Sequence, residues 1–354
     1  MKKALRNILF FLNLLAVLGL LSVYVSVHIP PDKFWVPAFI GLAYPFLLGI
    51  NLLFALFWLI IRWEYVLLSV AAIIIGLGSF SGFFQMGGKS AENSDVKVLS
   101  YNVKHFSGEG TTGGKENAER IISFLEKSDA DIICLQESRL RKNQVFNLSK
   151  TVKELKNIQH YQFASSSSTF GSVTMTRYPI VNMGEIRFEK SRNITIFTDM
   201  LIKGDTVRVY NLHLQSYQID PKSIAALESI EIQEEKSREI FKKVAKQMKL
   251  AFIMRASQAR EIRKHIDGCP YPVIVCGDFN DTPTSYSYRK IKDGLADAFV
   301  HSGHGVGRTY VGELSSFRID YILHSKSLKS FNFETLDFKH SDHLPIVCDF
   351  VLEN

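Results

Sequence analysis

Cysteine is scarce in this chain, with four among 354 residues, too few for a small disulfide-stapled scaffold. The composition, 46% hydrophobic and 22% charged, excludes a disordered or collagen-like protein. Cys134, Cys276 and Cys348 lie inside apolar, strand-like runs, which predicts buried free thiols rather than disulfides. No cysteine and histidine spacing typical of a zinc site is present.

Acidic residues are almost missing from the first quarter of the chain. Residues 1–90 contain six basic residues and only two acidic ones, Asp32 and Glu64. The remaining 264 residues carry 36 basic and 33 acidic residues, so they are nearly neutral. The pI near 9.0 is therefore a property of the amino-terminal segment and gives little support for a nucleic-acid partner.

Three apolar runs without charged residues follow one another: Ile8–Ile29, Phe34–Ile61 and Tyr65–Phe84. Each is long enough to cross about 30 Å of hydrocarbon at about 1.5 Å per residue. We therefore expect residues 1–84 to form an anchor of three transmembrane helices, in contact with the lipid bilayer through residues 8–84. A cleaved signal peptide fits less well, because no small-x-small site follows the first run.

The basic residues that flank these runs predict an orientation. They precede the first run or follow the second, as Lys2, Lys3, Arg6 and Arg62, whereas the first loop holds one lysine and one aspartate. Basic flanks stay in the cytoplasm, so a multi-pass protein of the cytoplasmic membrane is expected, with everything after Phe84 outside the cytoplasm. A re-entrant hairpin over residues 34–61 would reverse that orientation. A channel or transporter is not expected, because His28 is the only histidine, acidic or basic side chain within the runs.

A polar linker over residues 85–95 leads into a segment, 96–354, in which strand-like and helix-like runs alternate. This alternation predicts a single α/β domain of sheets covered by helices. The predicted helices are Lys115–Lys127, a stretch in the 150s and a long one near 223–266, and residues 162–172 are expected to be a surface loop. The predicted strands are Val96–Asn102, Asp131–Leu135, Ser172–Thr176, Ile194–Ile202, Thr206–Leu212, Val273–Cys276, Ile319–Leu323 and Pro345–Leu352.

A polar side chain able to do chemistry follows almost every one of these strands. The carboxylates and amides are Asn102, Glu137, Asp278, Asn280, Asp320 and Asp342, and the imidazoles are His213 and His343. Strand ends on one rim of a sheet can meet in one cleft. The oxygens suit Mg²⁺, Mn²⁺ or Ca²⁺, and the imidazoles can move protons or bind a phosphoryl oxygen. Together they are the groups used in metal-assisted hydrolysis of phosphate esters.

Each residue alone has a plainer interpretation. Asn102 could belong to a turn, Glu137 to a helix start, His213 to the core, and Asp320 to a helix cap. Arg318 could contact phosphate or lie on the surface. The plain interpretations would all have to hold at six separate strand ends, and we therefore favour the catalytic one.

The motifs that carry these residues resemble the endonuclease/exonuclease/phosphatase superfamily in their order along residues 96–352. They are Asn102 in LSYNV, Gln136-Glu137 in ICLQES, NLHL at 211–214, GDFND at 277–281, RIDYIL at 318–323 and SDHLPI at 341–346. The resemblance implies a four-layer DNase I-like sandwich, in which two packed β-sheets are flanked by helices, with the active site at one edge.

The resemblance also implies roles for the residues in these motifs. Glu137 would be the principal ligand of Mg²⁺ (or Mn²⁺), with Asn102 and Asp342 near it. Asp278 and Asn280 would orient the attacking water and the phosphate. His343, held by Asp320, and His213 would contact phosphoryl oxygens or handle protons, and the general base is left unassigned.

Two features depart from abasic-site nucleases of this superfamily. Lys104 stands where those enzymes carry a metal-binding aspartate. The segment Asp220–Leu250 is long and of mixed charge, which predicts a solvated helix face rather than a DNA-binding stripe. Its continuation, with Lys246, Lys249, Arg255 and Arg260, could instead touch anionic headgroups.

These features predict a membrane-anchored, metal-dependent phosphodiesterase or endonuclease, and no obligate protein partner is inferred. A phospholipid or inositol-phosphate phosphoesterase of the sphingomyelinase type is the alternative, since anchoring and the nearly neutral domain suit such a substrate. A catalytically inactive interaction domain is a third possibility, but none of the acidic and histidine positions is missing.

Overall fold

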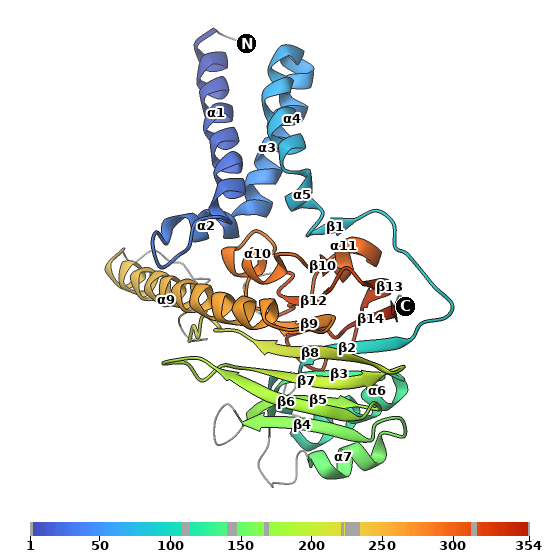
Figure 1. Cartoon of the computed structure of the whole chain (residues 1–354). Helices are drawn as coiled ribbons and strands as arrows, with labels where there is room; N and C mark the ends of the chain where they lie inside the picture. The colour runs from blue at the N-terminus through green and yellow to red at the C-terminus, as the bar shows by residue number, and fades with distance from the viewer. Residues whose placement is uncertain are drawn as a thin grey trace.

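The computed structural model of the chain describes residues 3–107, 114–139, 147–165, 170–220, 223, 234–312 and 317–352. In Figure 1, a group of upright helices stands on a layered α/β body. The body holds two six-stranded sheets that pack face to face, so the predicted sandwich is confirmed.

The first sheet has the strand order β13-β14-β2-β3-β5-β4. Its strands are β2 (Val96–Asn102), β3 (Ile132–Arg139), β4 (His160–Ser165), β5 (Phe170–Thr176), β13 (Leu328–Thr335) and β14 (Ile346–Leu352). β2 and β3 run parallel, with Asn102 opposite Gln136. The carboxyl ends of these two strands therefore lie side by side.

The second sheet has the order β10-β12-β9-β8-β7-β6. Its strands are β6 (Ile180–Arg187), β7 (Ile194–Ile202), β8 (Asp205–His213), β9 (Val273–Asp278), β10 (Ala296–Asp297) and β12 (Asp320–His324). β8 and β9 are its parallel pair, with His213 opposite Asp278. β12 runs antiparallel to β9 and places Asp320 opposite Asp278.

Apolar side chains from the inner faces of both sheets fill the space between them. Val98 and Cys134 from the first sheet and Val209 and Cys276 from the second belong to one buried cluster. Cys134, Cys276 and Cys348 are buried and all four cysteines are free, as the sequence predicted. The pairing of the sheets thus rests on hydrophobic burial rather than on covalent links.

Helices cover both outer faces of the sandwich. α6 (Gly114–Lys127) and α7 (Leu148–Glu154) pack on the first sheet. α9 (Glu234–Asp267) and α10 (Tyr286–Lys292) pack on the second, and α11 (Ala298–Ser302) lies at its edge. The predicted loop at 162–172 is wrong in part, because β4 ends at Ser165 and β5 begins at Phe170; residues 166–169 lie outside the described residues.

The upright part consists of α1 (Lys3–Ser26), α2 (Val36–Leu42), α3 (Tyr44–Ile61), the short helix η1 (Trp63–Tyr65), α4 (Val66–Ile75) and α5 (Leu77–Phe80). Among the described residues, α1 and α3 are the two helices long and apolar enough to cross a membrane. The three predicted transmembrane helices are therefore corrected to two candidates plus a shorter apolar helix, because the third run breaks at Gly76.

The break at Gly76 has a local cause in the packing of α4 against α1. The Tyr24 hydroxyl donates to the carbonyl of Ala72, and the Gly76 amide bonds to Ile73 instead. A Cβ at position 76 would overlap the Tyr24 ring. The second run breaks as well, because Pro45 in the first turn of α3 has no N–H to continue α2.

Buried polar side chains join the three longer upright helices. Asn13 of α1 donates to Ser69 of α4 at 2.7 Å and accepts from the Trp58 indole of α3 at 3.0 Å. All three side chains are fully buried. Such hydrogen bonds fix which faces of the helices meet, because an unpaired amide in this apolar surrounding would be unfavourable.

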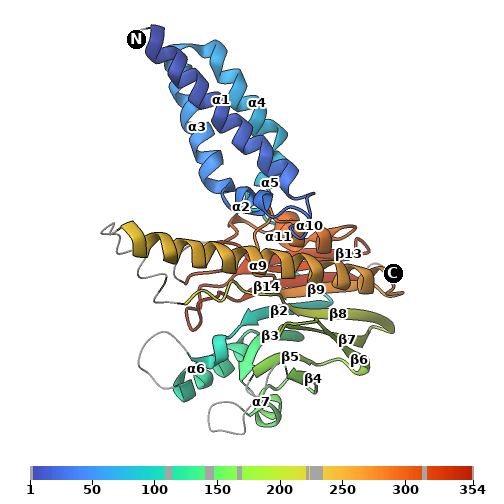
Figure 2. The same ribbon diagram turned by 90° about the vertical axis from the view of Figure 1, so that its left-hand side faces the viewer.

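The upright helices are docked directly on the body, as Figure 2 shows. Thr284 donates to the Gly41 carbonyl at 2.9 Å, and a Cβ at Gly41 would lie 2.5 Å from the Thr284 carbonyl oxygen. The buried Arg318 donates to the Gly82 carbonyl at 2.7 Å and forms a two-pronged ion pair with Asp297. Both expectations for Arg318, a phosphate contact or a surface position, are therefore wrong.

The segment predicted to be a linker is bound to the body over part of its length. β1 (Phe84–Gln85) pairs with β11 (Gly305–Val306), and the Asn332 amide donates to the Ala91 carbonyl at 2.9 Å. The chain between the upright helices and β2 therefore follows the surface of the body rather than separating the two parts.

Candidate active site

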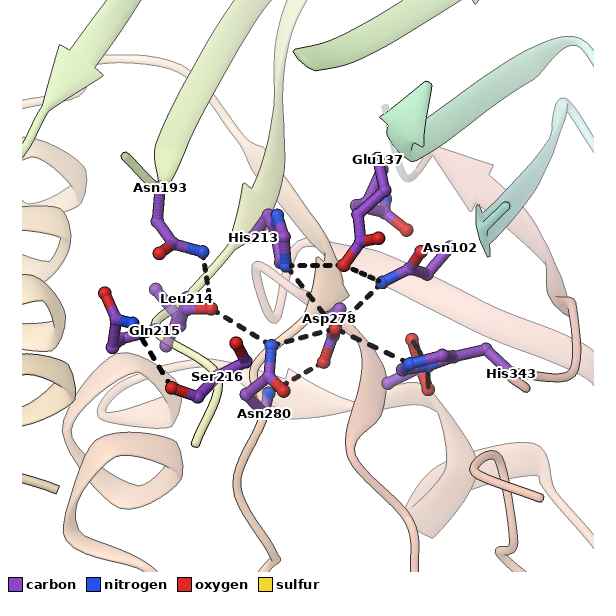
Figure 3. Close-up of polar contacts among 12 residues, drawn as sticks. Asn102, Glu137, Asn193, His213, Leu214, Gln215, Ser216, Asp278, Asn280 and His343 are labelled. Carbon is purple, nitrogen blue, oxygen red and sulfur yellow. Dashed lines mark hydrogen bonds and ion pairs between the residues drawn. The ribbon is translucent and has the colours of Figure 1, made fainter. Parts of the chain in front are cut away.

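The polar strand ends meet at one edge of the sandwich, where the two parallel strand pairs end (Figure 3). Asn102 and Glu137 come from the first sheet, and His213 and Asp278 from the second. Because both parallel pairs end at this edge, residues distant in sequence become neighbours across the two sheets. The predicted convergence of strand ends is thus observed.

The backbone takes positive φ angles where it presents these side chains. Glu137 has φ 52° and lies at an irregularity in the pairing of β3 with β5, between Leu135 and Ser138. Asn280 also has φ 52°, and Gly277 has φ 131°. A bulge re-aims one side chain, which explains how Glu137 points into the cluster although Gln136 lies in the core.

Asp278 is the centre of the cluster and is almost fully buried. Its carboxylate accepts from the Asn280 backbone at 2.7 Å, from the Asn280 amide at 2.9 Å and from the Asn102 amide at 3.0 Å. The Nε2 atoms of His213 and His343 each lie 3.8 Å from its Oδ2. Three N–H donors and two imidazoles thus surround one carboxylate.

Asp320 holds His343 in place from the side away from Asp278. The Nδ1 of His343 lies 2.9 and 3.1 Å from the two carboxylate oxygens of Asp320. The backbone N–H of Asp320 donates to the Thr309 hydroxyl at 3.0 Å. The predicted orientation of His343 by Asp320 is therefore seen in the contacts, and Nε2 is directed toward Asp278.

The pKa values of Asp278 and His343 are both raised, for different physical reasons. Burial, with help from the charge of Asp320, raises the pKa of Asp278 to about 6 against the lowering effect of His343 and His213. Burial lowers the pKa of His343, but the charges of Asp320 and Asp278 outweigh it and raise that pKa to about 10. At neutral pH the pair is thus a carboxylate beside an imidazolium.

Glu137 and Asp342 are the more accessible carboxylates, and each has a nitrogen of a side chain from the turn after β2 beside it. The Nε2 of His105 lies 3.2 Å from Glu137, and the Lys104 ammonium lies 2.9 Å from Asp342. Lys104 and His105 belong to a short turn, η2 (Lys104–Phe106), with positive φ angles throughout. The sequence predicted Lys104 only as a missing ligand and gave His105 no role. Both residues follow Asn102 within three positions, which was the available signal.

The donors at this edge fit a hard divalent cation. The compact group of Asp278, Asp320 and His343 has its ligand atoms within 4.8 Å of one another. Both Asp320 oxygens, however, are engaged by His343. Glu137 and Asp342 are partly exposed, and so are the side chains of His105 and Lys104 beside them. Their carboxylate oxygens are therefore the accessible hard donors of this edge, which is the environment expected of metal-binding carboxylates.

The sequence predicted Asn280 as a site residue, but not the residues that hold it and its neighbouring loop in place. The Asn280 amide also donates to the Leu214 carbonyl at 3.0 Å, which accepts from Asn193 at 2.8 Å as well (Figure 3). The fully buried Arg255 of α9 binds Asp281 at 3.0 Å and the Gln215 carbonyl at 2.7 Å. Nothing in the spacing of Asn193 or Arg255 indicated that they brace the loops after β8 and β9.

The two packed sheets, with an acid, amide and imidazole cluster at one edge, define a DNase I-like phosphoesterase fold. The family model described as the Endonuclease/Exonuclease/phosphatase family matches residues 99–343. The chain belongs to this family, whose members hydrolyse phosphate esters. A second model, of a domain of unknown function (DUF8431), matches residues 6–83.

Solved structures share this fold at low sequence identity. An endonuclease/exonuclease/phosphatase from Beutenbergia cavernae has a TM-score of 0.55 at 19% identity, covering 74% of this chain and 72% of its own. A mannosyl-6-phosphatase of Bacteroides thetaiotaomicron has 0.52 at 18%, covering 73% and 100%. The human Nocturnin catalytic domain with bound sulfate has 0.52 at 20%, covering 73% and 94%. A search of curated protein sequences gave no match.

Proposed function

We propose that this chain is a membrane-anchored, metal-dependent phosphodiesterase or endonuclease that cleaves phosphate esters by attack of water. The observation that carries the proposal is the cluster around Asp278, in which Asn102, Asn280, His213 and His343 converge on one buried carboxylate. A structural carboxylate would need its donors but would not need two imidazoles with Nε2 directed toward the same oxygen.

In this proposal Glu137 holds the divalent cation, Mg²⁺ or Mn²⁺, with Asn102 and Asp342 beside it. The bound cation supplies electrophilic stabilisation of the negative charge that grows on the phosphoryl oxygens. Lys104 and His105 would leave the carboxylates they now contact and face the substrate phosphate instead. The cation and these side chains together offset the charge of the pentacoordinate transition state.

The protons are handled by Asp278 and His343. Asp278, ionised at neutral pH, accepts a proton from the attacking water, while Asn280 orients that water. The oxygen of the water bonds to phosphorus as the bond from phosphorus to the leaving ester oxygen breaks, and the leaving oxygen takes its proton from solvent. His343, protonated and held by Asp320, donates a hydrogen bond from Nε2 to a phosphoryl oxygen, and His213 faces the same space from the other sheet. Because the donors are already fixed by hydrogen bonds, little reorganisation is needed during the reaction.

The pKa values of these two groups predict the pH profile. Asp278, with a pKa raised to about 6, acts only when ionised, so kcat/KM should fall about tenfold per pH unit below pH 6. His343, with a pKa raised to about 10, keeps its proton through neutral pH, so the rate should stay flat from pH 7 to 9. Initial rates from pH 5 to 9 at saturating metal test this. A loss of rate on raising the pH through 6.5 would contradict it, because it would show an ordinary histidine acting as the acid.

Anchoring in a membrane is part of the proposal and is supported by the surfaces of α1 and α3. Both helices are long and apolar enough to cross a bilayer, and most of each lies outside the packed interior. Leu53, Leu59 and Ile60 of α3 are more than 60% exposed. The body is docked at the end of these helices where α1 leads into α2, and Arg62 follows the far end of α3. If Arg62 marks the cytoplasmic side, the active site lies outside the cytoplasm.

A phospholipid or inositol-phosphate substrate is the second candidate function. The observation in its favour is that the upright helices are packed on the body through buried contacts such as Thr284 to Gly41, rather than joined by a free tether. This arrangement fixes the height of the active site above a bilayer, which matters for a lipid substrate and not for a diffusing one.

The test uses the full chain purified in detergent, incubated with plasmid DNA, with mixed phospholipids or with inositol phosphates. Each reaction is run with Mg²⁺, with Mn²⁺ or with a chelator, and beside a His343→Ala protein. Nicking of DNA that needs the metal and His343 would support the nuclease. Release of phosphate or headgroup from lipids alone would support the second candidate. A folded protein inactive on every substrate would contradict both and leave an interaction domain.

A further inference from the structure

Helix α9 lies across the base of the upright helices, and its amino-terminal part projects past them in both views (Figures 1 and 2). Three contacts show which side of α9 faces these helices. They are Lys249 over the Trp35 ring at 4.9 Å, Phe252 against Phe39 at 5.1 Å, and Arg260 paired with Asp32 at 2.9 Å. We call this the anchor-facing side of α9.

The anchor-facing side continues toward the amino terminus as a row of basic residues. Lys242 and Arg238 precede Lys249 by seven and eleven residues, which at 3.6 residues per turn puts all three on one side of the helix. Lys246 lies between Lys242 and Lys249 in the sequence, at the edge of this side of the helix. Arg238, Lys242 and Lys246 are exposed and form no ion pair with the described carboxylates. Residues 238–250 contain five basic residues and one acidic residue, Glu239.

We propose that this basic row, Arg238, Lys242, Lys246 and Lys249, binds the anionic phospholipid headgroups of the bilayer that holds α1 and α3. The inference rests on the proposed membrane anchoring. If the upright helices cross a bilayer, α9 lies along its surface, and the basic row is the side turned toward the lipid. Lysine and arginine side chains at such a surface are attracted to anionic lipids by the negative surface potential.

The surroundings of the row favour a lipid surface over a nucleic acid. Phe34 and Trp35 lie at the base of the upright helices and are partly exposed, and Phe241 of α9 is 66% exposed. Exposed aromatic side chains next to basic ones are typical of a membrane–water interface. The row is also continuous with the contacts that already join α9 to the anchor, whereas the other basic residues first considered, Arg255 and Arg260, are paired with Asp281 and Asp32.

This inference revises the sequence-based interpretation of the helix as a simply solvated face. Its solvated side exists, but Arg238, Lys242 and Lys249 share the anchor-facing side, whereas Glu239 lies on the flank. The same helix carries Arg255, which braces the loops of the active site through Asp281 and the Gln215 carbonyl. Lipid engagement of α9 would therefore fix the body at a defined tilt over the bilayer.

The test is hydrogen exchange of residues 238–250 in the full chain, reconstituted into nanodiscs of phosphatidylcholine alone or with 30% phosphatidylglycerol (about one lipid in three, enough to set a negative surface potential). We expect exchange to be at least about threefold slower in the anionic discs, with the difference lost at about 0.5 M salt. The double variant Lys242→Gln/Lys246→Gln should abolish the difference. The matched control, Lys153→Gln/Lys156→Gln, removes the same charge at exposed positions near α7, at the opposite end of the molecule, and should leave it intact.

Equal exchange of the unmodified chain in both discs would overturn the inference. So would a result in which the Lys242→Gln/Lys246→Gln variant and the control variant are slowed equally by the anionic discs. Slowing in phosphatidylcholine discs on adding inorganic phosphate would show a site for free oxyanions instead, and slowing on adding an oligonucleotide would show a nucleic-acid surface. Incorporation into nanodiscs and hydrolytic activity are measured on the same preparation. A chain that fails to incorporate refutes the anchor itself, whereas an incorporated, active chain with an insensitive α9 refutes only this inference.

Discussion

Replacing His343 by alanine should lower kcat/KM by about 10³-fold, the middle of the range for loss of one group that handles a proton. The reason is geometric. The imidazole is fixed by both oxygens of Asp320, and its Nε2 lies 3.8 Å from Oδ2 of Asp278. Initial rates on whichever phosphate ester the full chain cleaves, at saturating metal, measure the loss.

The alanine variant also leaves the buried Asp320 without its partner, at about 1 to 3 kcal/mol, so folding must be followed by thermal denaturation. His343→Gln is the sharper variant, since its amide can still donate to Asp320 but carries no ionisable proton. The matched control is His304→Ala, which removes an exposed imidazole. Asp320→Asn should cost about 10- to 100-fold, as expected of a residue that positions another. Full activity of His343→Gln would refute the role assigned to His343.

Replacing Gly277 by alanine should lower the free energy of unfolding by more than about 4 kcal/mol, a large part of the about 5–15 kcal/mol that is usual for a folded protein. Gly277 has φ 131°, a region that side chains avoid. A Cβ there would overlap the Leu212 carbonyl oxygen on the paired strand β8 and lie 2.8 Å from the Leu212 nitrogen. Because both sides of this contact are backbone, no rotamer change relieves it.

Gly204→Ala provides the control for backbone strain without the collision. Gly204 also has a positive φ, 95°, but a Cβ there would meet nothing within 4 Å. Its cost should be about 1 to 2 kcal/mol, from strain alone. Thermal denaturation of the two variants in the same detergent compares them. Similar melting temperatures would show that the approach of Gly277 to β8 is not what demands glycine.

Gly277 and His343 both contribute to the geometry of the cluster around Asp278. Gly277 lets β9 approach β8 at the point where Asp278 and His213 stand opposite each other. His343 then reaches Asp278 from the loop before β14, and Asp320 reaches it from β12. The geometry of the cluster around Asp278 therefore depends on close strand packing at one glycine as well as on the identity of its polar side chains.

The sequence by itself determined the order of the strands and the polar residues near their ends, and its resemblance to a known family predicted the two-sheet fold. The roles of the site residues stay predictions. Apolar runs such as Val273–Cys276 favour buried strands. GDFND, RIDYIL and SDHLPI each place a reactive group near one end of a strand: Asp278 ends β9, Asp320 begins β12, and His343 precedes β14. The strands that were not predicted lack a regular pattern of apolar residues. β13 and β6 were not predicted, because an edge strand exposed on one face, such as Ile180–Arg187, lacks a continuous apolar run.

Tertiary structure alone decided where long-range partners meet. The third apolar run was long enough to span a membrane, but the Tyr24 hydroxyl bonds the Ala72 carbonyl and Gly76 ends the helix. Arg318 was placed on the surface or at phosphate, and it is buried against Asp297 and the Gly82 carbonyl. A local pattern reports which residues prefer burial or a strand. It carries no information on which distant carbonyl or carboxylate a side chain will reach once the sheets have packed.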